Sequence, residues 1–514
     1  MRGPRVLTTW GCLLAILCSP QVAGANGRYP TAQQVIEDAR DPNHLIVRAT
    51  YGLLVTRDAG KRWSLICEQA VGYGGNEDPM LGLFGNGTLL AGTLRGLMLA
   101  ADDACSFRRA QGGLGSTEIV DIALQRMDRA RALVLARRAE TGFAEHRLWQ
   151  SSDHGANWKE LGGPFGAPQN LVATAFDAAP SQQRRIYVSG LVDAPTLQGV
   201  LLRSDNGAVS WTQLPIMNTG PQAIPFLSAV AANDPDTVYV RVRAVKGDRL
   251  LVSSDGGSSW RNVLDGNAVM AGFALSPDGA QLAIGFGLPE RPGNVDCDRL
   301  GVWKASTQDL LFSKVFSGVV QCLTWTEHGL YACSHEPTHG FEVGLSRDGG
   351  KSFAPLMKLR SVEGLACPSP SMLATACAAP WRKLCPLIGT SCNGAAGAPA
   401  PIPPASPLSC LGDAGFPATS SDAGRPNPLD AAADAQPDSV PSMPESQATG
   451  CGCSALGTRP ADTSPWPRIV LATCAFILCG ARRKTPARTT ECEPSMKKTR
   501  GQLRVCLPAR HHTA

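Results

Sequence analysis

The sequence is poor in aromatic residues, in long apolar runs and in clustered positive charge. Aromatic residues make up 6% of its 514 residues, and only six are tyrosines, so few side chains are available as a tyrosine nucleophile. The C-terminal apolar run at 469–480 has twelve residues, fewer than the roughly 20 that a membrane-spanning helix needs. Residues 481–514 carry nine lysines and arginines against two glutamates. The rest of the chain therefore has no basic excess of the kind that binds nucleic acid.

An eight-residue figure recurs along the chain: a hydroxyl residue, an aspartate two positions later, a glycine two further on and an aromatic three beyond. Aspartate and hydroxyl side chains bond nearby backbone amides and glycine accepts a positive φ, so the figure predicts a tight turn. Four copies keep this spacing and a fifth is stretched by one residue. Weaker echoes lie at Asp103 with Phe107 and at 305–312. The five copies are Thr56, Asp58, Gly60, Trp63; Ser151, Asp153, Gly155, Trp158; Asp205, Gly207, Trp211; Ser253, Asp255, Gly257, Trp260; and Ser346, Asp348, Gly350, Phe353.

Apolar runs on both sides of each figure predict a β-hairpin, and two more strand-like runs precede it. One such set of four is 227–231, 237–243, 249–253 and 260–263. Seven units of about 50 residues predict an all-β fold, a seven-bladed β-propeller of four-stranded antiparallel blades. The spacing of residues 362–378 predicts two strands of a further blade, so a ring of eight blades stays open.

The repeats resemble the Asp-box (BNR) propellers, a group that includes sialidases, the sortilin luminal domain, xyloglucan-cleaving hydrolases and photosystem II assembly factors. The resemblance covers about residues 28–378 and implies that the box aspartates hold turns at one rim, away from any ligand. Strands A to D of a blade then place their B–C and D–A loops at the other rim, where we expect ligand-binding residues. The longest of these loops are 68–79, 137–147, 191–199, 287–301 and 334–342.

Composition divides the chain into six parts, and the first is a signal peptide at 1–25. We expect a propeller at 26–378, a Cys-rich cap at 379–392, a disordered Pro/Ala/Asp-rich linker at 393–465, a short hydrophobic anchor with a basic cluster at 466–484 and a basic tail at 485–514. The order of linker, hydrophobic segment and basic cluster resembles the C-terminal surface-sorting tails of myxobacterial secreted proteins. We therefore expect an exported protein tethered at the cell surface.

Eighteen cysteines in an exported chain predict disulfides. Neighbouring-blade geometry favours a bridge between Cys67 and Cys105, although sequence alone does not fix connectivity. A structural zinc site is the competing interpretation of the cluster at 367–392. The nine candidates for disulfides are Cys67, Cys105, Cys297, Cys322, Cys333, Cys367, Cys377, Cys385 and Cys392.

No catalytic residue and no cofactor are predicted. Sialidase chemistry would need three arginines, a tyrosine and glutamate pair and an aspartate acid, whereas Tyr187 and Tyr239 lie inside predicted strands. Residues 335–339 match the H-E-x-x-H zinc motif, but Pro337 interrupts the helix that this motif requires. His335, His339 and Glu342 are weak metal-ligand candidates.

The sequence thus predicts a surface-displayed binding module for a protein or a surface glycan, without catalysis and without nucleic acid. The alternative is a secreted Asp-box glycoside hydrolase, sialidase-like or xyloglucanase-like. Two carboxylates across a cleft are needed for such hydrolysis. A carboxylate pair or three arginines at the channel mouth would favour the enzyme, and small and scattered polar residues would favour binding.

Overall fold

A computed structural model describes residues 30–75, 77–140, 143–166, 170–193, 196–245, 247–288, 296–367, 369–390 and 392. The signal peptide, linker, anchor and tail expected at 1–25 and 393–514 lie outside these residues. Within them, no helix is both long and apolar enough to cross a lipid bilayer.

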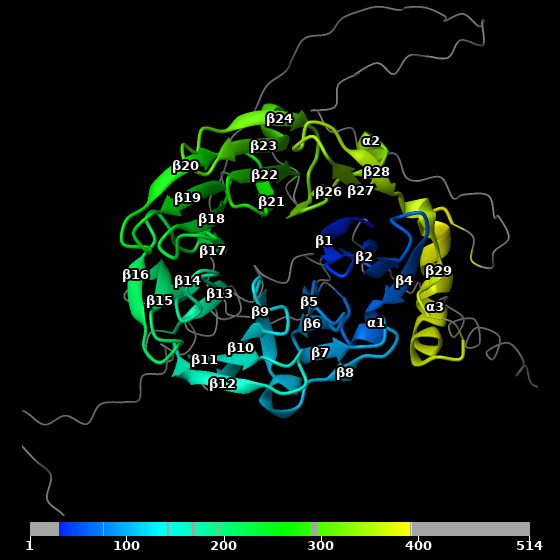
Figure 1. Cartoon of the computed structure of the whole chain (residues 1–514), viewed down its shortest axis with the longest axis horizontal. Coiled ribbons are helices and arrows are strands. Elements are labelled where there is room, and N and C mark those ends of the chain that lie inside the picture. The colour runs from blue at the N-terminus through cyan, green and yellow to red at the C-terminus, as the bar shows by residue number, and fades with distance from the viewer. Residues whose placement is uncertain are drawn as a thin grey trace, which may run out of the picture. The chain divides into compact units, whose positions relative to one another are not determined.

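Seven sheets stand in a ring, and in each one four antiparallel strands follow one another in chain order from the innermost strand outward (Figure 1). We name the strands of each blade A to D in chain order. Blades 1 to 3 contain β1 (Ala32–Asp38), β2 (Asp41–Ala49), β3 (Gly52–Thr56), β4 (Trp63–Cys67); β5 (Met80–Leu83), β6 (Leu89–Thr93), β7 (Gly96–Ala100), β8 (Arg108–Arg109); and β9 (Glu118–Leu124), β10 (Ala132–Glu140), β11 (Phe143–Ser151), β12 (Lys159–Phe165). Blades 4 and 5 contain β13 (Val172–Ala178), β14 (Ile186–Asp193), β15 (Leu197–Ser204), β16 (Thr212–Pro215); and β17 (Ala223–Val230), β18 (Val238–Ala244), β19 (Arg249–Ser253), β20 (Arg261–Asp265). Blades 6 and 7 contain β21 (Val269–Leu275), β22 (Gln281–Gly287), β23 (Gly301–Ser306), β24 (Ser313–Ser317); and β25 (Cys322–Thr326), β26 (Gly329–Cys333), β27 (Val343–Ser346), β28 (Ala354–Met357).

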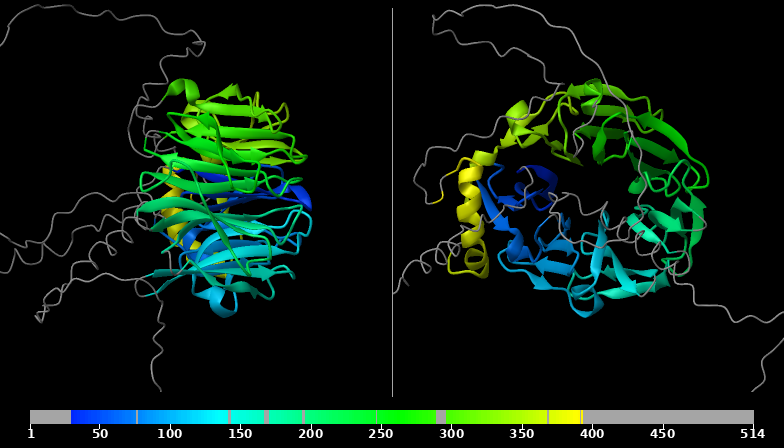
Figure 2. Two further views of the ribbon diagram at one scale, coloured as in Figure 1. Left: turned by 90° about the vertical axis from the view of Figure 1, so that its left-hand side faces the viewer. Right: turned by 180° about the vertical axis from the view of Figure 1, so that it is seen from behind.

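The fold is therefore the predicted seven-bladed β-propeller, and the ring of eight blades is wrong. The apolar core lies between the blades, because each sheet is apolar on both faces and packs against its neighbour. Figure 2 shows the stacked sheets from the side and the ring from behind. Leu53, Leu54 and Val55 of β3 are all fully buried, which is why this strand reads as a continuous apolar run rather than an alternating one.

The ring closes on blade 1, where β29 (Val362–Leu365) pairs in parallel with β4 as a fifth strand. The second strand predicted within residues 362–378 is wrong, since helix α3 (Met372–Leu387) begins there. Ser371 caps this helix by accepting a hydrogen bond from Ala374 N at 3.0 Å, and the alanine-rich first turns favour a helix. Helix α3 also crosses the boundary expected at residue 378 and packs outside β4 and β29 (Figure 1).

Two disulfides fasten this C-terminal segment to the first two blades. Cys67 at the end of β4 is bridged to Cys377 in α3, and Cys105 in blade 2 is bridged to Cys367. The predicted Cys67–Cys105 bridge is wrong because the closing segment lies between these two residues and takes both. The remaining candidates also form disulfides. Cys322 is bridged to Cys333 and Cys385 to Cys392, and Cys297 is disulfide-bonded.

Several expected loops contain regular structure. The described parts of two expected loops, 137–140 with 143–147 and 191–193 with 197–199, are ends of long hairpins, because the antiparallel pairing of β10 with β11 and of β14 with β15 continues into them. Short helices lie in two other connections, α1 (Glu68–Val71) and α2 (Glu336–His339). Single turns of 3-10 helix lie at η1 (Gly112–Gly115), η2 (Cys297–Arg299) and η3 (Leu359–Ser361).

Candidate functional site

The repeated figure forms the turn between strands C and D. In blade 5, Ser253 Oγ accepts from Gly257 N at 2.7 Å and donates to Asp255 Oδ1 at 2.7 Å. The Asp255 carboxylate accepts in turn from the backbone and hydroxyl of Ser259, and these bonds lower its pKa to about 2. Gly257 has φ +93°, and a Cβ there would lie 2.5 Å from Leu201 Cδ2. The same pairing of hydroxyl, aspartate and glycine holds the turns of blades 1, 3 and 7.

The turn of blade 4 corrects the residues assigned to it. Ser204 Oγ bonds Asn206 Oδ1 and accepts from Ala208 N, and Asn206 accepts from Ser210 N. Asn206 therefore takes the aspartate position and Ala208, at φ +68°, takes the glycine position. The spacing to Trp211 is regular rather than stretched, and Asp205 and Gly207 are not the turn-holding pair.

A similar shift applies to the weaker echo in blade 2. There Asp102, not Asp103, accepts from Ser106 N at 2.9 Å and from Ser106 Oγ at 2.6 Å. Ala104 has φ +64° and takes the glycine position. Neither shift could be predicted from the sequence. Alanine replaces the glycine in both turns and asparagine replaces the aspartate in blade 4, while another aspartate lies one position away.

The box aromatics fasten each turn to the preceding blade. Trp63 Nε1 donates to Leu356 O of blade 7 at 3.2 Å, and Trp260 Nε1 donates to Pro215 O of blade 4 at 3.1 Å. These contacts give the repeated turns a structural role, stabilising the joints between neighbouring sheets.

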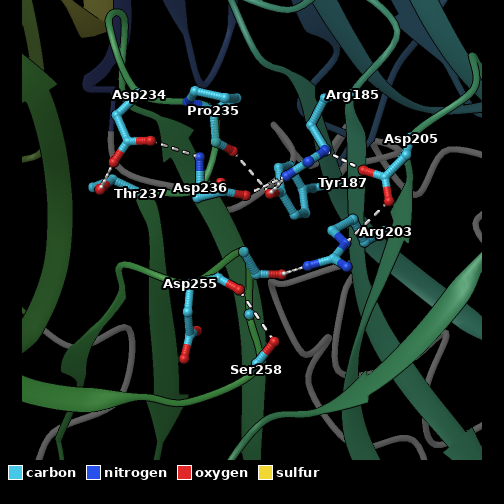
Figure 3. A network of polar contacts seen from close by, with 12 residues as sticks. Arg185, Tyr187, Arg203, Asp205, Asp234, Pro235, Asp236, Thr237, Asp255 and Ser258 are labelled. Carbon is cyan, nitrogen blue, oxygen red and sulfur yellow. Dashed lines mark hydrogen bonds and ion pairs between the residues drawn. The ribbon is translucent and has the colours of Figure 1, made fainter.

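Asp205 instead belongs to an ionic network between blades 4 and 5 on the same face (Figure 3). Arg185 lies between Asp205 and Asp236 and forms ion pairs with both, and Arg203 lies 3.5 Å from Asp205. Tyr187 donates its hydroxyl to Pro235 O at 2.8 Å across the joint. Because Arg185 and Tyr187 of blade 4 contact Asp236 and Pro235 of blade 5, the network joins these two blades.

The three weak metal-ligand candidates bond to different groups. His335 Nδ1 contacts Thr338 Oγ1 at 2.7 Å, and His339 Nε2 accepts from Val319 N at 2.8 Å. Glu342 is buried and accepts from Ala32 N at 3.2 Å, so it ties blade 7 to blade 1, and burial raises its pKa to about 7. In the described part of the chain, no three His, Cys, Asp or Glu side chains are grouped to hold a metal ion. Glu342 and the hydrogen bond from Val319 N to His339 make the segment part of the joints between neighbouring blades.

A cavity of about 240 Å³ lies inside the ring, lined by β5, β9, β13, β17, β18 and β21. Its lining residues cluster around the middle of the A strands, and they extend to Met80 and Met270 near the starts of β5 and β21 and to Arg243 near the end of β18. The D–A connections enter strand A and the B–C turns leave strand B, so the cavity lies near the middle of the ring's depth and is displaced slightly toward the end opposite the boxes. The sequence predicted binding residues at that end.

Bulges in the innermost strands aim residues into this cavity. Val120, Thr174, Ser228 and Ala271 each lack a partner in the ladder to strand B, and each lines the cavity. A bulge inserts one extra residue and re-aims its side chain. These positions could not be predicted from the sequence, because a bulge leaves no distinct residue pattern.

Two aspartates of the innermost strands bond the next blade. Asp121 Oδ2, in the cavity lining, accepts from Phe176 N at 3.1 Å, and Asp177 Oδ2 accepts from Val230 N at 3.2 Å. Burial raises the pKa of Asp121 to about 7 and that of Asp177 to about 6. Of these two, Asp121 alone lines the cavity, together with Arg241 and Arg243 of β18.

No protein-family model matches the chain, and no curated protein matches it. Similar solved structures include an ancestral GH74 enzyme, at 13% identity and TM-score 0.44 over 60% of this chain and 45% of that one. The GH74 xyloglucanase from Xanthomonas campestris matches at 14% identity and TM-score 0.31 over 66% of each chain. The extracellular domain of a candidate one-component system from B. thetaiotaomicron matches at 13% identity and TM-score 0.40 over 60% of this chain and 38% of that one.

The chain thus spans less than half of the first of these proteins and under two thirds of the third. At such low identities and scores, these similarities carry no argument about what the chain binds or does.

Proposed function

We propose that the protein is an exported, surface-displayed Asp-box propeller that binds a protein or a surface glycan through the cavity opposite the boxes, without catalysis. The observation that carries the proposal is the composition of the cavity lining. It holds one carboxyl group, Asp121, and two arginines among Met, Val, Thr, Ala, Ser, Leu, Gly and Phe residues. Among the residues that the structure describes, neither a carboxylate pair nor three arginines line it, and two-acid glycoside hydrolysis requires such a pair.

Export is supported by the disulfides, since five or more cysteine pairs rarely persist in a reducing cytoplasm. The proposed tether lies in the C-terminal residues outside the described part of the chain.

The experiment is a binding screen of the purified protein against immobilised glycans and against surface proteins, with a blocked cavity as the comparison. Ala271→Trp places a large side chain in the cavity from a bulge position that is partly exposed. Ala156→Trp is the matched control, because Ala156 is exposed in the box turn of blade 3 at the opposite face. We expect Ala271→Trp to lose binding and Ala156→Trp to keep it. Equal binding by all three proteins would reject the cavity as the site.

A secreted glycoside hydrolase is the second candidate, and one observation favours it. The pKa of Asp121, about 7, is that of a carboxyl group that stays protonated near neutral pH, as a general acid must. Release of reducing sugar from any glycan bound in the screen, lost in Asp121→Asn, would establish this reading.

A further inference from the structure

Arg241 is a cation in the cavity wall that has no ion-pair partner among the described residues. Its Nη1 donates to Met270 O at 2.6 Å, and its guanidinium lies over the Phe226 ring, 5.0 Å from the centroid. Asp248 is the acid whose charge acts on Arg241, but its two oxygens accept from Ala244 N and Met270 N. Arginine has five N–H donors, and the bond to Met270 O uses one of them, on Nη1 of this cavity-lining residue.

A guanidinium in a cavity wall without an ion-pair partner destabilises the folded protein unless an anion binds to it. Burial lowers the pKa of Arg241, which shows that the surroundings disfavour its charge. Charged groups removed from bulk water are normally paired, and guanidinium suits a carboxylate because it donates two parallel hydrogen bonds. Arg243 lines the same cavity two residues along the strand and adds positive charge there.

The remaining polar groups of the cavity select for hydroxyl groups on the ligand. Asp121 accepts a hydrogen bond from one backbone amide at each oxygen, and its carboxyl group has further positions for hydrogen bonds. Ser228 Oγ has no hydrogen-bond partner within the described ranges and lines the cavity. Phe273 adds an aromatic surface. The volume of about 240 Å³ is below that of typical ligand pockets, roughly 300–1,000 Å³, so it suits one ring-sized group.

We propose that the cavity binds a hydroxylated organic anion of the size of one sugar ring, a uronic acid or a uronate unit of an acidic polysaccharide. Its carboxylate bonds Arg241, and its hydroxyl groups bond Asp121 and Ser228. This inference rests on the proposed function, because it names the ligand class of the same cavity.

The test is calorimetric titration of the full-length protein with three probes: glucuronate, glucose and inorganic phosphate. Glucose keeps the hydroxylated ring without the carboxylate, and phosphate keeps the anion without the ring. Arg241→Met removes the charge, and Arg241→Lys keeps a charge near Asp248 but loses the two-pronged donor geometry. Arg108→Met is the control, since Arg108 is exposed on the outermost strand of blade 2.

We expect glucuronate to bind at least about tenfold more tightly than either other probe, as a charge-assisted pair of hydrogen bonds allows. That preference should disappear in Arg241→Met, weaken in Arg241→Lys and persist in Arg108→Met. Preference for glucose, or equal affinity for glucose and glucuronate, would overturn the inference while leaving a binding cavity in place. Retained preference in Arg241→Met, or no binding of any probe at millimolar concentration, would also overturn it.

Discussion

Ring closure by two disulfides gives the most quantitative prediction. The perturbation is removal of both bridges between the C-terminal segment and the first two blades, in a Cys67→Ala, Cys377→Ala, Cys105→Ala, Cys367→Ala variant. These bridges span 310 and 262 residues, so each alone joins nearly the whole ring. The variant keeps the pairing of β29 with β4 but has no covalent link between the ends of the ring.

The loss of unfolding free energy can be calculated from the lengths of the loops that the disulfides close. With one bridge already closed, the other closes a loop made of the 38 residues from Cys67 to Cys105 and the 10 from Cys367 to Cys377, roughly 48 in all. Chain-entropy estimates give about 4 kcal/mol for such a loop and about 6 kcal/mol for one of 262 residues. Removing one bridge should therefore cost about 4 kcal/mol and removing both about 10 kcal/mol. The second figure approaches the whole stability of a typical domain.

The assay is guanidinium unfolding of the wild type, the two single-bridge variants and the double variant. Removal of the Cys322–Cys333 bridge is the control, because it closes only 11 residues between paired strands and should cost about 3 kcal/mol. A double variant that loses no more free energy of unfolding than this control would refute the claim that the two bridges hold the ring closed.

Further predictions concern the turns and the buried acids. Ala208→Gly should stabilise the protein by about 1 kcal/mol because alanine is strained at φ +68°, whereas Gly257→Ala should destabilise it through strain and the clash with Leu201; urea midpoints measure both. Ser253→Ala should cost about 1–3 kcal/mol, because it leaves the buried Gly257 amide without its acceptor, and a change below the error of urea unfolding would contradict this. Thermal unfolding should be most resistant near pH 4. Asp121 and Glu342 have folded pKa values of about 7, above their unfolded values of 3.8 and 4.5, so the stability they contribute is complete below pH 4 and is lost as the pH rises to 7. The box aspartates have lowered pKa values, so their contribution is lost as the pH falls from 4 toward 2; a melting temperature that rises between pH 4 and 7 would contradict the signs.

The fold was readable from the sequence because its signal is local and repeated. Each box places a hydroxyl, a carboxylate and a positive-φ glycine within eight residues, and strands such as Arg249–Ser253 follow directly from the apolar runs beside it. In blade 4, Asn206 and Ala208 replace the usual aspartate and glycine of the box. The sequence pattern therefore assigned the turn to residues one position away from those that form it.

Only the approximate location of the candidate site could be predicted from the sequence, and its residues could not. Topology predicts ligand-binding residues opposite the boxes, but it does not predict that Arg241, Asp121 and Ser228, from three strands of two blades, line one cavity. Nothing in a strand pattern distinguishes an arginine that faces a cavity from one that faces solvent. The disulfide partners were hidden for a similar reason, because Cys377 reaches Cys67 only after the ring has closed.

The central claim is that the boxes build the scaffold and the opposite end of the ring holds the ligand. A crystal structure of the protein with the ligand found in the binding screen tests it most directly. The account predicts electron density for the ligand beside Arg241 and the bulged residues of the innermost strands. Density lying against the box turns, with the cavity unchanged, would contradict it.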